Sequence, residues 1–248
     1  MAKWWLANWR SRLAFASRNP GYAIRSVFRD MLALDERFLA RVTGAPAAQV
    51  SGFLSEPFQD RRFQDRLQTA EKELQGTEAI GAALYAKRVL LQYAIVRAFK
   101  PDLILETGIA NGVSSAYVLL ALDHNQKGVL HSIDVDDGSF RPAGKGIGWI
   151  VPDWLRSRWT MHLGDARTLL PQVLAKLGLL DVFIHDSAHT YEHMKFEYEE
   201  AYPHIRPGGI LISDDALWNP AFPEFVRTVK APLARVLRGI GVLQKPPL

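Results

Sequence analysis

Residues 179–216 read LLDVFIHDSAHTYEHMKFEYEEAYPHIRPGGILISDDA, and this stretch decides the fold. Two apolar runs, at 179–184 and 209–213, flank a polar segment of helical length that is broken at 207–209 by Pro-Gly-Gly. Runs of Val, Ile and Leu without alternation are typical of strands buried on both faces. The order strand, helix, strand predicts a right-handed crossover in a parallel sheet, and therefore an α/β fold of the doubly wound, Rossmann-like kind.

Each apolar run is followed by acidic residues. Asp186 follows the first run, and Asp214 and Asp215 follow the second. The ligand crevice of an open parallel sheet lies outside the carboxyl ends of its strands, so acids that close neighbouring strands face the same ligand. Three converging carboxylates repel one another unless a cation lies among them or one keeps a proton, and Mg²⁺ with oxygen ligands suits such a group. The alternative is that these acids solvate strand ends or cap helices.

A second stretch, LILETGIANGVSSAYVLLAL at 103–122, predicts a strand at 103–105, a glycine turn at 106–112 and a helix at 113–122. Gly108 and Gly112 let the backbone approach a ligand and leave amide groups facing it. The pattern G-x-G-x-x-G is absent, and Glu106 precedes the first glycine. A carboxylate there repels a pyrophosphate but accepts hydrogen bonds from an ammonium group, which favours a ligand with an amino-acid portion over NAD.

The next segments predict two more strand ends. The run at 128–137, GVLHSIDVDD, predicts a strand that ends at Asp134, a position suited to ribose hydroxyl groups, with a helix cap or loop acid as the alternative. A third strand is expected at residues 164–166. Asp165 suits an adenine amino group there, although an N-cap of the following helix fits almost as well. The glycine-rich loop at 137–154 is expected to help form a substrate pocket.

Composition limits the class of protein. The chain has 248 residues, of which 48% are hydrophobic, enough for one large domain with a buried core. No apolar run approaches the ~18 residues of a membrane span, and the N-terminus lacks the apolar core of a signal peptide, so we expect a cytoplasmic protein. The chain has no cysteine, which excludes disulfides, thiolate metal sites and cysteine nucleophiles. Its net charge is +4, but the central region has no Lys/Arg cluster with interleaved aromatics, so no nucleic-acid partner is expected.

The N-terminal part has a different pattern. Residues 1–29 are basic and rich in Trp, and Trp5, Trp9 and Leu13 fall on one helical stripe. This favours either a helix packed on its own domain or on a second copy in a homo-oligomer, or peripheral contact with an anionic membrane. Residues 22–100 read as helical, with a loop at 43–57. We expect a helical extension or lid at 1–100 ahead of a catalytic domain at 101–248.

These motifs resemble those of the class I S-adenosylmethionine-dependent methyltransferases. Glu106, Gly108 and Gly112 match their first motif, with Ala110 where a middle glycine is usual. The sequence at 185–215 is similar to sequences in the branch of metal-dependent small-molecule O-methyltransferases that includes the macrolide-sugar enzymes. It is also similar to those of the cephalosporin hydroxylase-like proteins. The resemblance covers roughly residues 85–216, a little over half the chain. The end after Pro223 departs from it, because it reads as too short for a full final strand pair.

The resemblance implies S-adenosylmethionine as cofactor, Mg²⁺ as metal and a small-molecule hydroxyl (sugar, polyketide or phenol-like) as methyl acceptor. It implies Asp186, Asp214 and Asp215 as metal ligands, with His189 as the base and Asp186 also catalytic. The alternative functions are other chemistry on the same scaffold, hydroxylase-like, and a non-catalytic, membrane-associated module that binds the cofactor. The predicted cofactor residues are Glu106, Thr107, Gly108, Asn111, Gly112, Ser114, Asp134, Asp165, Ala166 and Asp186.

Overall fold

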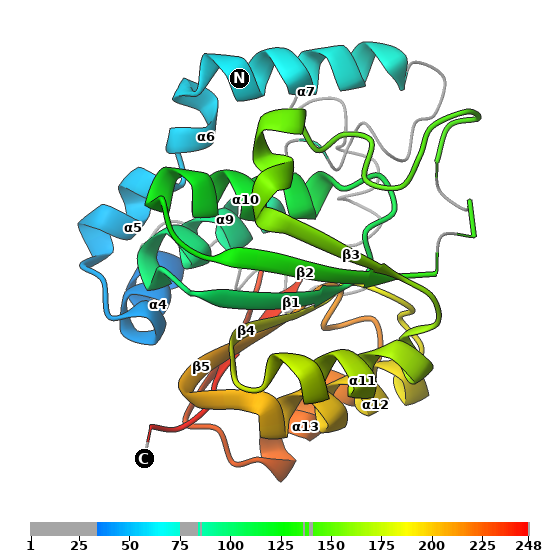
Figure 1. The fold of residues 1–248 in the computed structure, drawn as a ribbon. Coiled ribbons are helices and arrows are strands. Elements are labelled where there is room, and N and C mark those ends of the chain that lie inside the picture. The colour runs from blue at the N-terminus through cyan, green and yellow to red at the C-terminus, as the bar shows by residue number, and fades with distance from the viewer. Residues whose placement is uncertain (1–33, 75–83, 85, 136, 139–140, 248) are drawn as a thin grey trace.

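The computed structural model describes residues 34–74, 84, 86–135, 137–138 and 141–247 (Figure 1). Its strands are β1 (Leu103–Thr107), β2 (Val129–Asp134), β3 (Trp159–Leu163), β4 (Leu180–His185), β5 (Ile205–Ser213), β6 (Leu233–Leu237) and β7 (Ile240–Gln244). They form one sheet in the order β3-β2-β1-β4-β5-β7-β6, in which β1 to β5 are parallel and β7 is antiparallel to both of its neighbours. This confirms the predicted α/β fold with a parallel sheet.

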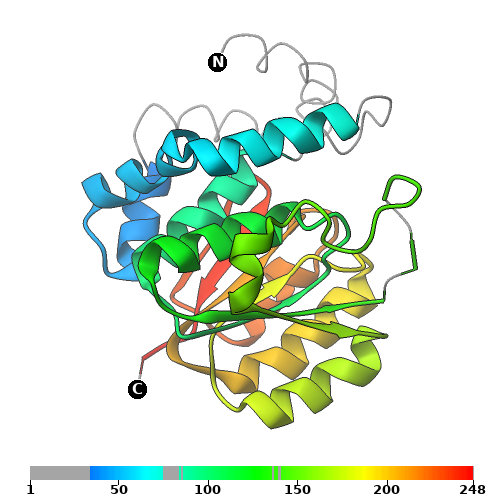
Figure 2. The same ribbon diagram turned by 45° about the horizontal axis from the view of Figure 1, so that its top comes forward.

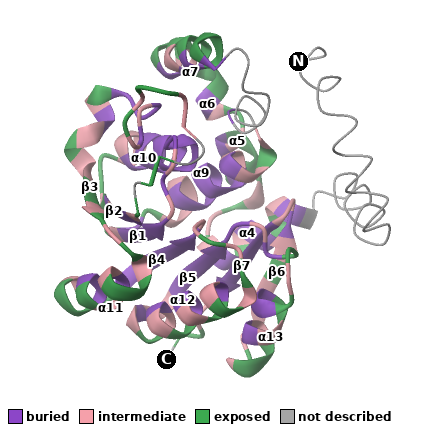
Figure 3. Ribbon diagram, turned by 90° about the vertical axis from the view of Figure 1, so that its right-hand side faces the viewer, coloured by how far each residue is buried: buried purple, intermediate pink, exposed green. Residues whose placement is uncertain are grey.

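Helices cover both faces of the sheet (Figure 1). The helices are α4 (Leu34–Thr43), α5 (Ala47–Phe53), α6 (Glu56–Gln59), α7 (Arg61–Glu73), α9 (Lys87–Phe99), α10 (Val113–Asn125), η1 (Asp153–Arg158), α11 (Ala166–Leu177), α12 (Tyr191–His204) and α13 (Ala221–Thr228). Successive strand residues point to opposite faces, so Ile104 packs with α9 and α10 while Leu105 packs with α11 and α12. Burial on both faces explains why the central strands read as continuous apolar runs (Figure 3).

The N-terminal helices share a core with the sheet. Phe38 and Leu39 of α4 belong to the same buried cluster as Ile210 of β5 and Val242 of β7. Helix α7 lies farther out (Figure 2), where Arg62 stacks on Trp154 at 3.8 Å and Arg66 Nη2 donates to the carbonyl of Trp149. The expected boundary near residue 100 therefore falls inside one continuous hydrophobic cluster.

Several element predictions were wrong. The third strand is Trp159–Leu163, and residues 164–166 lead into α11. The expected loop at 43–57 contains α5, which buries Val50 and Phe53, and the start of α6. The chain end forms a full antiparallel pair, β6 and β7, joined at Arg238 and Gly239 with φ of 52° and 98°, the left-handed conformation of a two-residue hairpin turn.

Two expectations about partners are not tested by this structure. The basic, Trp-rich stretch at 1–29 lies outside the described residues, so membrane contact and a homo-oligomer stay predictions. Among the helices of the described part, none has the length and apolar character that crossing a membrane requires.

Candidate active site

The glycine turn between β1 and α10 is held by Asp134 at the end of β2. One carboxylate oxygen of Asp134, Oδ2, accepts hydrogen bonds from the backbone N–H groups of Ile109 (2.5 Å) and Ala110 (2.9 Å). Gly108 has φ of +89°, and a Cβ built on it would lie 1.9 Å from the carbonyl oxygen of Asp186. The turn therefore needs glycine at 108 because the end of β4 crosses it at backbone distance.

A cavity of about 490 Å³ lies over this turn, at the carboxyl ends of the strands. This size falls within the roughly 300–1,000 Å³ of small-molecule sites. The predicted cofactor residues that line it are Gly108, Asp134, Asp165, Ala166 and Asp186, and other lining residues include Arg141, Ser187 and His193. The crevice is thus formed where the topology of an open parallel sheet places it.

Five predicted cofactor residues lie outside the described lining of this cavity: Glu106, Thr107, Asn111, Gly112 and Ser114. The side chain of Asn111 instead accepts a hydrogen bond from Trp149 Nε1 at 2.7 Å, and a Cβ on Gly112 would meet Gly148 at 2.8 Å. Asn111 and Gly112 therefore anchor the loop at 145–150, and their contact with a cofactor stays a prediction.

Glu106 is fully buried beneath the turn. Its Oε1 accepts hydrogen bonds from the hydroxyl groups of Ser115 and Ser132, whereas Oε2 has no partner among the described residues. Burial raises the pKa of Glu106 to about 7, although the two serine hydroxyls act in the opposite direction. Oε1 of Glu106 is thus used for bonds to the neighbouring helix and strand, and the ammonium contact expected at Glu106 stays a prediction.

Asp165 occupies the N-cap of α11, the alternative considered for it. Its Oδ1 accepts from the backbone N–H of Arg167 at 2.6 Å, which satisfies one of the free amide groups at the helix start. The residue lines the cavity as well. Capping and cavity lining therefore coexist at this position.

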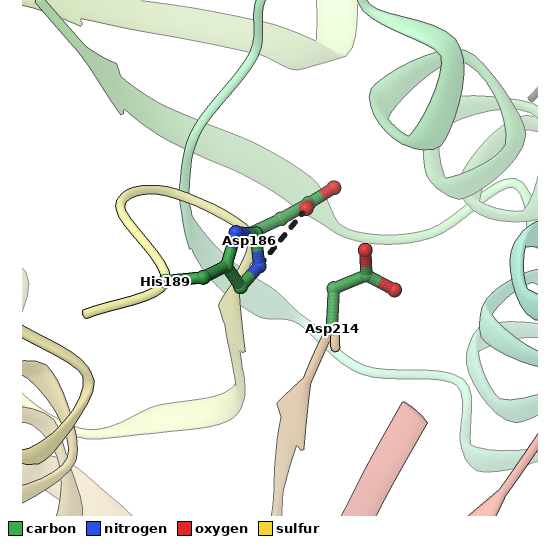
Figure 4. A group of neighbouring side chains, drawn as sticks. All are labelled: Asp186, His189 and Asp214. Atoms are coloured by element: carbon green, nitrogen blue, oxygen red, sulfur yellow. Dashed lines mark ion pairs between the residues drawn. The ribbon is translucent and has the colours of Figure 1, made fainter. Parts of the chain in front are cut away.

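A second feature lies beside the cavity, where Asp186, His189 and Asp214 come together (Figure 4). One ligand atom from each residue lies within 4.8 Å of the others. Asp186 follows β4 and Asp214 follows β5, so neighbouring parallel strands deliver the two acids to one place. Asp214 Oδ1 and His189 Nε2 are buried and have no hydrogen-bond partner in the described part of the chain.

Asp215 is adjacent to this group but is not one of its three members. Its φ of +44° is left-handed, and its Oδ1 lies 3.8 Å from Arg88 Nη1. His189, the predicted base, lies 3.9 Å through Nε2 from Asp186 Oδ1. Thr190 caps α12 by accepting from the N–H of His193, so His189 is not the capping residue of this helix.

The electrostatics of the group follow from crowding of like charges. Burial, and then the charge of Asp214, raise the pKa of Asp186 well above its ordinary value, while Arg88 acts in the opposite direction. Burial and Asp214 likewise raise the pKa of Asp215. Burial, followed by His185, lowers the pKa of His189, which keeps the imidazole neutral near pH 7.

Arg88 was not predicted from the sequence. It lies in the first turn of α9, and its Nη1 is 3.1 Å from Asp214 Oδ2. No local pattern marks it, because the pairing joins a helix ahead of the sheet to the end of β5. Trp218, three residues after Asp215, is 74% exposed and is therefore not part of the core.

Comparison with known proteins bears on the same segment. Residues 105–216 match the model of a family described as a methyltransferase domain. The match covers a little under half of the chain. The matched segment includes the glycine turn, the cavity-lining acids and the whole group at Asp186, His189 and Asp214.

The curated relatives overlap only part of this chain. Demethylmacrocin O-methyltransferase of Streptomyces fradiae is 28% identical over 101 residues, which are 40% of this chain and 22% of that protein. Mycinamicin VI 2''-O-methyltransferase of Micromonospora griseorubida is 28% identical over 92 residues, which are 35% of this chain and 23% of that protein. The chain thus spans less than a quarter of the length of either relative.

Solved methyltransferase structures share the fold of the domain. An SAH-bound methyltransferase from Podospora anserina superposes with a TM-score of 0.53 at 13% identity, covering 73% of this chain and 88% of that one. A putative O-methyltransferase from Klebsiella pneumoniae gives a TM-score of 0.50 at 20% identity, covering 66% and 81%. The described part of the chain therefore has the class I, Rossmann-like fold of these structures.

Proposed function

We propose that this chain is an S-adenosylmethionine-dependent O-methyltransferase that methylates a hydroxyl group of a small molecule with the help of Mg²⁺. The observation that carries the proposal is the position of Asp186, which lines the cavity over the glycine turn and belongs to the group with His189 and Asp214. A methyl donor in the cavity and a cation at the acids would then meet at one residue.

The cavity fits the proposed cofactor in its chemistry. Asp134 is the last residue of β2, where an acid suits ribose hydroxyl groups, and Asp165 and Ala166 line the same cavity. We propose that these residues, with Gly108 and Asp186, hold S-adenosylmethionine. Glu106 and Thr107, together with Asn111, Gly112 and Ser114, would act from behind by fixing the turn.

The acidic group fits a divalent cation. Two buried atoms that could serve as a ligand or as a base, Asp214 Oδ1 and His189 Nε2, lack hydrogen-bond partners among the described residues and lie close to Asp186. Unpaired polar atoms are costly in a protein interior unless an ion or water satisfies them. Because Mg²⁺ prefers oxygen over nitrogen ligands, we propose Asp186, Asp214 and Asp215 as its ligands and leave His189 for proton transfer.

When bound, S-adenosylmethionine supplies a methyl group whose bond to the sulfonium sulfur breaks with its electron pair passing to sulfur, and Mg²⁺ lowers the pKa of a hydroxyl group. Neutral His189 would accept the hydroxyl proton at Nε2 while the acceptor oxygen forms its bond to the methyl carbon. Asp186 would fix the position of the methyl donor relative to the acceptor hydroxyl group. In a direct displacement, such positioning is the main contribution of the enzyme to the rate.

The relatives support the reaction class. Both curated relatives are O-methyltransferases by name. A solved O-methyltransferase from Bacillus cereus, with a TM-score of 0.50 at 19% identity over 64% of this chain and 80% of that one, is a complex with SAH. Since these proteins share only part of their length or only the fold with this chain, the acceptor itself stays a class: sugar, polyketide or phenol-like.

Isothermal titration calorimetry tests the proposal directly. We expect S-adenosylhomocysteine to bind and NADH not to bind, and we expect Mg²⁺ binding to disappear in Asp186→Ala. Methylation of a panel of hydroxylated acceptors should then depend on Mg²⁺ and stop with a chelator. Binding of NADH in place of S-adenosylhomocysteine would overturn the proposal. Cofactor binding without any metal binding or turnover would favour the non-catalytic module instead.

A further inference from the structure

Glu197, in the middle of α12, is a fully buried carboxylate with four side-chain donors. Its Oε2 accepts from the Thr107 hydroxyl (2.5 Å) and from His185 Nδ1 (2.6 Å). Its Oε1 accepts from the Ser187 hydroxyl (2.8 Å) and from His193 Nε2 (2.9 Å). Although burial by itself raises the pKa of Glu197, the bonds from His185 and His193 lower it to about 2, so the group stays ionised.

The two oxygens of Glu197 face different parts of the site. Oε2 binds side chains at the ends of two strands, Thr107 on β1 and His185 on β4, the residue immediately before Asp186. The ring of His185 stands edge-on to that of His189, with centroids 5.3 Å apart and planes at 76°. Through Oε2, therefore, Glu197 fixes the strand end and the ring that support the acidic group.

Oε1 of Glu197 faces the wall of the cavity over the glycine turn. Ser187 and His193, which both donate to it, line the cavity over the glycine turn. His193 lies one helical turn before Glu197 in α12, so the pair shares one helix face. Through Oε1, Glu197 holds the cavity wall that continues from Asp186 into α12.

We propose that Glu197 is a positioning residue that fixes the cofactor pocket and the metal site relative to each other. Oε1 would hold the cofactor pocket, and Oε2 would hold the metal site. This inference rests on the proposed function. Buried residues that orient ligands of a metal or substrate from behind fix the direction of the ligand atoms, and their loss typically weakens metal binding about 10- to 100-fold. The neutral Gln side chain has the same shape but accepts through one oxygen only, so it must present a donor group to two of the four present donors.

The test compares Glu197→Gln with Glu199→Gln, a matched change at an exposed position of the same helix that pairs with Lys195 at 3.7 Å. Calorimetry measures the Kd values of S-adenosylhomocysteine and of Mn²⁺ separately for the wild type and each variant. We expect Glu197→Gln to weaken at least one of them about tenfold or more, and Glu199→Gln to leave both unchanged. Wild-type affinity for both ligands in folded Glu197→Gln would overturn the inference.

A second variant keeps the test decisive if Glu197→Gln fails to fold. Ser187→Ala removes one donor to Oε1 and leaves the bonds at Oε2 intact. We expect weaker binding of S-adenosylhomocysteine with an unchanged Mn²⁺ Kd, a split that general destabilisation would not produce. An equal loss of affinity for both ligands, or no loss for either, would contradict the assignment of Oε1 to the cofactor pocket and Oε2 to the metal site. A wild-type chain that binds neither ligand would instead overturn the proposed function.

Discussion

Nη1 of Arg88 lies 3.1 Å from Oδ2 of Asp214, while Oδ1 of the same carboxylate is buried without a partner among the described residues. One oxygen of the acid is thus neutralised by a guanidinium from α9, and the other is directed into the group with Asp186 and His189. Arg88 therefore acts as a counter-ion inside the chain, which partly offsets the repulsion of the acids before any cation binds.

Replacement of Arg88 tests this counter-ion role. We expect Arg88→Met to lower the free energy of unfolding by about 2 kcal/mol without metal, less than a fully buried pair would lose because the Arg88 side chain is 36% exposed. Mg²⁺ should restore more stability to the variant than to the wild type, since the ion then supplies the missing charge. Urea unfolding with and without Mg²⁺ measures both effects, and an equal Mg²⁺ response in the two proteins would contradict the prediction.

The third metal ligand is tested by two single changes. If Asp215 is the ligand and His189 the base, Asp215→Asn should weaken Mg²⁺ binding about tenfold, whereas His189→Gln should keep Mg²⁺ binding and lose turnover. Calorimetry with Mg²⁺ separates the two assignments. Loss of Mg²⁺ binding in His189→Gln but not in Asp215→Asn would assign the nitrogen as ligand, as the close grouping of Asp186, His189 and Asp214 would allow.

Glu106 makes stability depend on pH. Its pKa of about 7 in the folded chain lies above the ordinary value of 4.5, so the fold favours the protonated acid. The associated stability is fully present below pH 4.5 and is lost as the pH rises through 7, by about 3 kcal/mol. We expect Glu106→Gln to lack this loss. Between pH 5 and pH 8, the unfolding free energy of the variant should therefore fall less than that of the wild type. Parallel pH profiles in urea unfolding would contradict this.

The crossing of the glycine turn by β4 is tested at Gly108. Gly108→Ala places a Cβ 1.9 Å from the carbonyl oxygen of Asp186, so backbone must move. Gly44 has a similar left-handed φ of +76° but nothing within 4 Å of a built Cβ, which makes Gly44→Ala the control for conformational strain alone. We expect about 1–2 kcal/mol for Gly44→Ala and a clearly larger loss, with loss of S-adenosylhomocysteine binding, for Gly108→Ala. Equal losses in thermal or urea unfolding would show that the contact is relieved without cost.

The sequence predicted the centre of the sheet better than its edges. The strands β1, β4 and β5 are buried on both faces, so their apolar runs were visible. Strand β3 lies at the edge with only intermediate and exposed residues, which hid it. The Arg238-Gly239 turn between β6 and β7 lacks the Asn-Gly or Asp-Gly signature of a tight hairpin.

The site was predictable where topology alone places residues. Asp186 and Asp214 meet because neighbouring parallel strands end side by side. Arg88 and Glu197 could not be placed in this way, since Glu197 meets Thr107 across 90 residues of sequence. The one local signal was the spacing of His193 and Glu197, four residues apart in a helix. The burial of Glu106 against Ser115 and Ser132 likewise depends on packing rather than on motif.

The central claim is that the cofactor cavity and the acidic group form one cleft through Asp186. Paramagnetic broadening of bound S-adenosylhomocysteine by Mn²⁺, followed by NMR, tests it most directly, with the double variant Asp186→Asn/Asp214→Asn as control. We predict strong broadening of the ligand resonances in the wild type and its loss in the variant. Sharp resonances in a wild-type complex that binds both Mn²⁺ and S-adenosylhomocysteine would contradict the claim.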